Sequence, residues 1–278
     1  MKQTDRLKLM VGYLEGEYSD PSDYQNLPAY NLDDDDQNQL TKRQELANKW
    51  RQLVNVRPAK PASDQYLSLQ DTYLALENND GPTYGFTDGY IKSDQISLWQ
   101  GDITQLAVDA IVNAANNQAE GCFIPGHNCI DNIIHTKAGI QLRLDMHQQI
   151  KSRGRKLATG QALISSAYNL PATYVIHTVG PVVQGGQVTD IKADQLAQCY
   201  QSCLALAEEK GLKTIAFCCI ATGVFGYPAD QAAQVAIKTV ENYISQENSQ
   251  IKVIFNVFTD QDLAIYADRL GIDLEEEK

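Results

Sequence analysis

The chain has 278 residues, 43% of them hydrophobic, which suffices for one large domain or for one domain with an extension. Its net charge is -12, and a surface of that sign repels a phosphate backbone, so no nucleic-acid partner is expected. A small anionic ligand remains compatible with this charge, because backbone N–H groups can hold phosphate without basic side chains.

The opening segment, MKQTDRLKLMVGYLEGE, lacks the apolar core and the small-residue cleavage site of a secretory signal. The sequence contains no run of about 18 apolar residues, so no transmembrane helix and no membrane partner are expected. We therefore expect a cytoplasmic protein. In that compartment clustered cysteines indicate a metal site or chemistry more often than disulfides.

Residues 1–90 are predicted to form a helical extension that packs on the following domain. Apolar residues recur there at helical spacing in three segments. These positions are Leu7, Met10, Val11 and Leu14, then Leu40, Leu46, Trp50 and Leu53, then Tyr66, Leu69, Tyr73 and Leu76. Between the first two segments, residues 19–39 are rich in Pro and Asp and are predicted to form a loop. Its acidic run, Asp33 to Asp36, is interpreted as a solvated cluster.

From about residue 91 onward, short apolar strands alternate with helices. Strands are predicted at 96–101, 107–116, 162–167, 173–180, 214–220 and 252–259, and helices at 129–154, 195–211, 228–247 and 261–270. This alternation predicts a three-layer α/β domain with a parallel or mixed sheet. Ligands of such sheets bind beyond the carboxyl ends of the strands, so the loops after strands are the places to search.

Three such loops carry candidate ligand-binding residues. GDIT, residues 101–104, places Asp102 after the first apolar strand, although this pattern alone is typical of a turn. The segment Thr222 to Gly226 is small and glycine-bearing, and it precedes a helix predicted near Pro228. Backbone N–H groups in such a loop can surround a phosphate, aided by the helix dipole. A structural turn is the alternative for any one loop, but two loops of this kind on one sheet edge favour a diphosphate site.

The third loop, residues 113–132, contains Cys122, His127 and Cys129 within eight positions. Two thiolates and one imidazole suit Zn²⁺, and the intervening Pro125 and Gly126 permit a tight loop. Three ligands without a second pair at structural spacing indicate an open site whose fourth position is left to water or substrate. The alternatives are incidental loop residues, or a structural zinc completed by a remote ligand such as His135 or His147.

The motifs GDIT, DAIVNAAN, IDNIIHTKAG, TYVIHTVGP and ATGVFGYP, in this order, resemble the macrodomain family of ADP-ribose-binding modules. The MacroD-like hydrolases are the most similar branch. In those enzymes a glycine run ending in an aspartate follows NAAN, whereas here GCFIPGHNC stands in its place. This insert resembles the zinc-dependent macrodomains of bacteria and fungi, which carry an N-terminal helical extension. The resemblance implies a three-layer α/β/α macrodomain with a mixed central sheet at residues 91–278, preceded by the extension at 1–90.

The resemblance also implies roles for individual residues. Asp102 would accept a hydrogen bond from the adenine amino group, Asn116 would contact the distal ribose, and Asp131 matches the aspartate that ends the glycine run. Asp131 and Asn116 are thus the expected catalytic residues, with the role of Asp131 shared with, or displaced by, the metal. The expected ADP-ribose contacts are Asp102, Ile103, Asn116, Ile130, Asp131, Asn132, Thr222, Gly223, Val224, Phe225 and Gly226.

The implied reaction is the removal of mono-ADP-ribose from protein side chains, typically from esters of Asp or Glu, with one Zn²⁺ per chain. A reader that binds ADP-ribose without cleaving it, and a deacetylase of O-acetyl-ADP-ribose, are the alternatives. The expected partners are ADP-ribose and mono-ADP-ribosylated proteins. Members of this branch are often encoded with a sirtuin-type ADP-ribosyltransferase and a lipoyl-carrying protein similar to glycine-cleavage protein H, which suggests a target.

Overall fold

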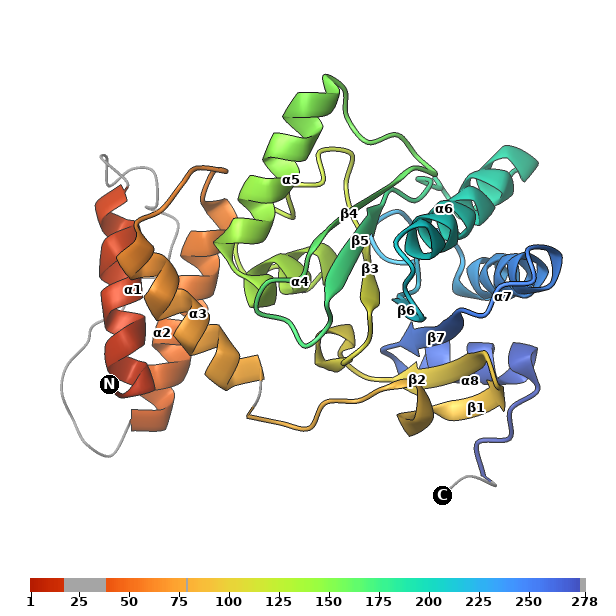
Figure 1. The fold of residues 1–278 in the computed structure, drawn as a ribbon, viewed down its shortest axis with the longest axis horizontal. Coiled ribbons are helices and arrows are strands. Elements are labelled where there is room, and N and C mark those ends of the chain that lie inside the picture. The colour runs from red at the N-terminus through yellow and green to blue at the C-terminus, as the bar shows by residue number, and fades with distance from the viewer. Residues whose placement is uncertain (18–38, 79, 276–278) are drawn as a thin grey trace.

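The computed structural model describes residues 1–17, 39–78 and 80–275 (Figure 1). At its centre lies a seven-stranded sheet with the order β1-β2-β7-β6-β3-β5-β4. The strands are β1 (Tyr90–Ser93), β2 (Ile96–Gln100), β3 (Ala110–Ala114), β4 (Ala162–Ser166), β5 (Tyr174–Thr178), β6 (Thr214–Phe217) and β7 (Lys252–Val257). Strands β1 and β4 pair antiparallel to their neighbours and the other pairs are parallel, so the predicted mixed sheet is confirmed.

Helices cover both faces of this sheet. On one side α4 (Ile130–Ala138) and α5 (Ile140–Arg153) pack together, and on the other α6 (Asp190–Glu209), α7 (Ala229–Gln246) and α8 (Asp260–Leu270) lie in a row (Figure 1). The predicted three-layer α/β/α architecture is therefore confirmed. None of the helices in the described ranges is both long and apolar enough to cross a bilayer.

The helix predicted at 129–154 is in fact two helices, because Gly139 breaks it. Gly139 has a φ of 102°, which side chains with a Cβ rarely adopt, and its N–H still bonds to His135 O as the last link of α4. A Cβ at this position would lie 2.6 Å from Gln70 Nε2 of the extension. Glycine thus both turns the chain and lets the extension approach the macrodomain.

Two predicted strands are shorter than expected at their carboxyl ends. The segment 107–116 forms a strand only over Ala110–Ala114, and 214–220 only over Thr214–Phe217. The residues that follow each of these strands leave the sheet and line a cleft, as described below.

The extension consists of α1 (Gln3–Glu17), α2 (Gln39–Val56) and α3 (Asp64–Asn78), which pack together beside the sheet domain (Figure 1). Their buried side chains form a small hydrophobic cluster of their own. Most of the predicted apolar positions are buried in it, but Leu76 is 51% exposed and Leu74 is buried instead. The reason is that the buried face of α3 consists of Tyr66, Gln70, Tyr73 and Leu74, and Leu76 lies outside this face. The acidic run Asp33 to Asp36 and the side chain of Leu40 lie outside the described residues.

Candidate active site

A cleft of about 1060 Å³ opens at the carboxyl ends of the parallel strands β2, β7, β6 and β3. Ligand sites of α/β sheets lie at this edge, and the volume suits a nucleotide-sized molecule. Of the residues predicted from the sequence, the cleft is lined by Asp102, Ile103, Asn116, Cys122, His127, Cys129, Ile130, Asp131, Thr222, Gly223, Val224 and Phe225. Asn132 and Gly226 do not line it.

Asp102 lies at the β2 end of the cleft, at the start of a short 3₁₀ turn. Its Oδ1 accepts hydrogen bonds from Thr104 N at 3.0 Å and Thr104 Oγ1 at 2.6 Å, and Lys137 Nζ lies 2.9 Å from Oδ2. Burial opposes the charged form of this carboxyl, but the hydrogen bonds from Thr104 and Lys137 outweigh it and hold the pKa below its usual range. Asp102 is therefore a fixed, ionised acceptor.

The loop after β6 presents free backbone donors to the cleft. Ala221 and Gly226 have positive φ values of 68°, and Gly226 N bonds to Gly223 O at 2.9 Å, which curls the segment between them. Within the part of the chain that the structure describes, the N–H groups of Gly223, Val224 and Phe225 have no backbone acceptor. A loop with outward N–H groups in front of the α7 N-terminus can bind a diphosphate.

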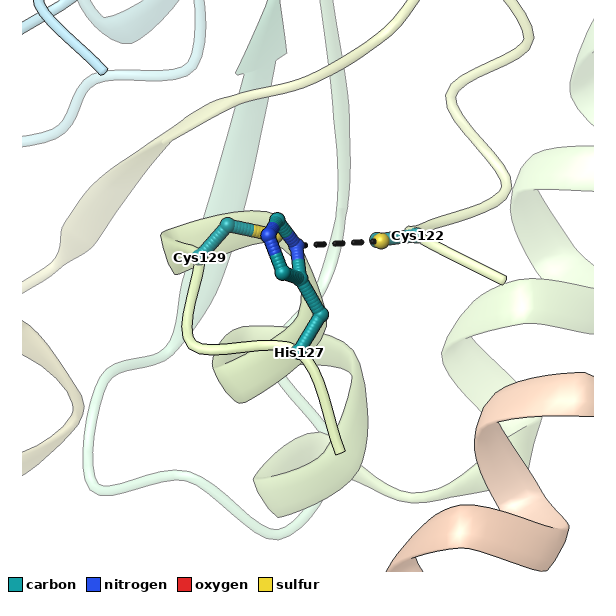
Figure 2. Close-up of side chains that lie close together, drawn as sticks. All are labelled: Cys122, His127 and Cys129. Carbon is teal, nitrogen blue, oxygen red and sulfur yellow. Dashed lines mark hydrogen bonds between the residues drawn. The ribbon is translucent and has the colours of Figure 1, made fainter. Parts of the chain in front are cut away.

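Cys122, His127 and Cys129 converge at the wall of the cleft, and their ligand atoms all lie within 4.8 Å of one another. Figure 2 shows the imidazole of His127 directed at the Cys122 sulfur, with a Cys122 Sγ to His127 Nδ1 distance of 3.5 Å. Tetrahedral zinc with bonds of about 2.3 Å to sulfur and about 2.0 Å to nitrogen would separate these atoms by about 3.5 Å. The donor set and the distance between Cys122 Sγ and His127 Nδ1 therefore fit Zn²⁺.

The remote fourth ligands considered from the sequence do not join this cluster. Among the described residues, no other His, Cys or carboxylate belongs to the group. His147 Nδ1 instead lies 2.9 Å from Glu120 Oε1, and His135 is buried beside Asp131 and His177. Burial raises the pKa of the Cys129 thiol above its usual value.

Asn132 braces the loop of residues 121–129, named the metal loop here for its three candidate ligands, and does not face the cleft. Its fully buried amide donates to Ile124 O at 3.1 Å and to Cys122 O at 3.5 Å, both within the loop. Its position at the first turn of α4 turns the side chain toward the extension, where Arg51 donates to Oδ1 at 3.1 Å. The side chain of Asn132 is thus engaged by the loop and by Arg51, and its predicted contact with the ligand stays a prediction.

Asp131 lies in the first turn of α4 and is 5% exposed. Asn113 Nδ2 donates to its Oδ1 at 2.8 Å, and Asn116 Nδ2 to its Oδ2 at 3.3 Å, so the first and last residues of NAAN both orient it. Burial raises the pKa of Asp131 to about 6, while the hydrogen bond from Asn113 acts in the opposite direction. A general base works best when its pKa lies near the pH of the reaction, and the pKa of Asp131 meets this condition near neutral pH.

Asn113 and His177, for which the sequence predicts no role, form a buried polar network behind Asp131. Asn113 pairs with His177 across β3 and β5, and Asn113 Nδ2 lies 3.1 Å from His177 Nδ1. On its other side, His177 Nε2 lies 3.0 Å from Ser165 Oγ on β4. The signal in the sequence is one polar residue inside each of two apolar strands, Asn113 in AIVNA and His177 in YVIHT. Only the register of β3 and β5 shows that these two side chains meet.

Comparison with known proteins places this arrangement in a family. Residues 112–236 match the Macro domain model. A relative from Staphylococcus aureus (strain MRSA252) named "Protein-ADP-ribose hydrolase" is 51% identical over 232 residues, covering 84% of this chain and 87% of the relative. The chain therefore belongs to the macrodomain family.

Solved structures agree with this assignment. The Trypanosoma brucei macrodomain in complex with ADP-ribose has a TM-score of 0.62 and 27% identity, covering 80% of this chain and 95% of that chain. The Oceanobacillus iheyensis macrodomain with ADP has a TM-score of 0.58 and 35% identity, covering 66% of this chain and 94% of that chain.

Proposed function

We propose that this chain is a zinc-dependent protein-ADP-ribose hydrolase that removes mono-ADP-ribose from modified side chains, in particular from Asp and Glu esters. The observation that carries the proposal is that a buried carboxylate, Asp131, and a Cys-His-Cys cluster line one nucleotide-sized cleft. The relative from Staphylococcus aureus, named for this activity, supports it through 51% identity over most of both chains.

The two ends of the cleft suit the two ends of an ADP-ribose molecule. At the β2 end, the ionised Asp102 provides an acceptor for the adenine amino group, with the Ile103 backbone beside it. Between the ends, the N–H groups of Gly223, Val224 and Phe225 bind the diphosphate. This seating places the distal ribose near Asn116, Phe225 and the metal cluster.

Asp131 is the residue that positions and deprotonates the attacking water. The hydrogen bonds from Asn113 and Asn116 fix its carboxylate, and a pKa of about 6 leaves it ionised at neutral pH yet basic enough to accept a proton. Asn116 also holds the Gly121 carbonyl at 3.1 Å, which ties this carboxylate to the start of the metal loop.

Cys122, His127 and Cys129 would hold the zinc ion and leave one position of its tetrahedron open. When bound, Zn²⁺ supplies Lewis acidity, which orients a sugar hydroxyl or water and stabilises developing negative charge. The chain's own contribution is to deliver two thiolates and one imidazole in a fixed loop next to Asp131.

Two substitutions in the cleft test the proposal. Cys122→Ala should leave the fold intact, lower the zinc content measured by mass spectrometry, and slow ADP-ribose release from a mono-ADP-ribosylated protein by at least about a hundredfold. Asp131→Asn should keep the zinc and the binding of ADP-ribose but lose release to a similar degree, because an amide cannot accept the proton.

Specific outcomes would contradict the proposal. Full turnover by metal-free Cys122→Ala would show that the reaction does not require zinc. Wild-type protein that retains the modified substrate without releasing ADP-ribose would be a reader, and release confined to O-acetyl-ADP-ribose would make it a deacetylase.

As first target we propose a lipoyl carrier similar to glycine-cleavage protein H, modified by a sirtuin-type transferase, because of the family resemblance.

A further inference from the structure

Helix α2 of the N-terminal extension reaches the metal loop through Arg51. Its Nη2 donates to His127 O at 2.8 Å and to Asn132 Oδ1 at 3.1 Å, and its Nε lies 3.3 Å from the same Oδ1. His127 is one of the three metal-ligand candidates, and Asn132 holds two other carbonyls of the loop. One guanidinium therefore joins a ligand residue to the residue that braces its loop.

Asn55, one helical turn further along α2, holds the same loop from a second point. Its side chain is 1% exposed, its Oδ1 accepts from Gly126 N at 2.9 Å, and its Nδ2 donates to Thr136 Oγ1 at 3.0 Å. Gly126 immediately precedes His127 and has a φ of 63°. Asn55 thus fixes the tight turn that brings the imidazole back toward Cys122.

We propose that Arg51 and Asn55 are positioning residues of the metal centre, so that the extension holds the loop in its ligand geometry and thereby sets the affinity for zinc. This inference rests on the zinc site of the proposed function. Residues that hydrogen-bond to metal ligands and orient them typically matter for metal binding. Their removal weakens the metal affinity by about 10–100-fold. The effect arises because a loop without these bonds must be ordered at the moment of binding.

The arrangement of the interface explains why α2 in particular carries this role. Helix α3 also contacts the macrodomain, but its bonds go elsewhere: Asn78 Nδ2 donates to Asn169 O at 2.6 Å and to Lys137 O at 3.2 Å. Neither acceptor belongs to the metal loop. Asn78 therefore provides a matched control, an interface asparagine whose loss weakens docking of the extension without touching residues 121–129.

The test measures zinc affinity of the full-length chain by competition with a chromophoric chelator, after circular dichroism has shown that each variant is folded. Arg51→Ala and Asn55→Ala should each raise the zinc dissociation constant at least about tenfold, and Asn78→Ala less than about threefold. Arg51→Lys keeps the charge but lacks the planar guanidinium that presents Nε and Nη2 to the two acceptors, so it should fall between wild type and Arg51→Ala. This milder variant also serves if Arg51→Ala does not fold.

Wild-type zinc affinity in the three α2 variants would overturn the inference, and so would an equal loss in Asn78→Ala, because that would show a general loosening of the interface. A wild-type chain that binds no zinc would overturn both this inference and the proposed metal site. A wild-type chain that binds zinc but releases no ADP-ribose would refute only the hydrolase function, because the affinity comparison does not depend on turnover.

Discussion

His177 is a buried imidazole at the centre of the polar network behind Asp131, with His135 packed against it. Burial lowers its pKa from 6.5 to about 3, so the folded protein keeps it neutral. In the unfolded chain the same residue takes up a proton below about pH 6.5. The unfolded state thus binds more protons between these two values, and stability must fall as the pH falls through this window.

We predict that the free energy of unfolding decreases by about 2 kcal/mol between pH 7.5 and pH 5 because of His177 alone. Urea denaturation at the two pH values, in wild type and in His177→Gln, isolates this contribution, since Gln can bond to Asn113 and Ser165 without titrating. The other acid-sensitive groups, including His135 and Asp131, are present in both proteins. Equal pH dependence in the two proteins would contradict the prediction.

The convergence of Cys122, His127 and Cys129 could be predicted from the sequence, whereas the Asp131 network could not. Cys122, His127 and Cys129 are close in the chain, so residue type and spacing suffice to propose a shared ion. Asn113 and His177 are brought together only by the register of β3 and β5, which no local pattern encodes. The direction of the Asn132 side chain had no local signal for a related reason, since it depends on the position of the extension.

Arg143 of α5 shows how one side chain joins the extension to the macrodomain. It is 5% exposed, and its Nη1 donates to the carbonyls of Val54, Asn55 and Arg57 at 2.6–2.9 Å, while its Nε donates to Glu120 O at 2.7 Å. The first two carbonyls are at the end of α2, where helical acceptors lack partners and a positive charge is favourable.

We expect Arg143→Met to lower the free energy of unfolding by about 3 kcal/mol, because several buried carbonyls would lose a charged donor while the volume is largely kept. Thermal and urea denaturation measure the change. Arg155→Met, at an exposed position after α5, is the control and should change stability by less than about 0.5 kcal/mol. Similar effects of both substitutions would show that Arg143 contributes no more than a surface arginine.

Periodicity predicted the helices well but did not predict where they break. The apolar spacing continues through residues 129–154, so the sequence predicts one helix. The break at Gly139 meets a tertiary requirement, the close approach of Gln70 from α3. The helical character of the extension was evident from its spacing, but its contacts with the metal loop are long-range and had no local signal.

At the scale of the whole molecule, the described residues form two hydrophobic clusters of unequal size, a large one in the macrodomain and a small one in the extension. Ile140 packs against the small cluster, and side chains such as Arg51, Asn55 and Arg143 add polar contacts between the two parts. Small cores separated by polar contacts unfold at lower free energy than large continuous ones. The two tryptophans report on the two parts, since Trp50 is buried in the small cluster and Trp99 in the large one.

Each tryptophan can be followed alone, Trp50 in the Trp99→Phe variant and Trp99 in the Trp50→Phe variant. We predict that in metal-free protein the fluorescence of Trp50 changes at a lower urea concentration than the fluorescence of Trp99. Zinc should raise the Trp50 midpoint as well as the Trp99 midpoint, because a ligand that binds only the folded state stabilises every element coupled to its site, and α2 holds the metal loop. Coincident transitions without metal would show that the polar contacts already make one cooperative unit. A Trp50 midpoint that is the same with and without zinc would show that the extension is not coupled to the metal centre.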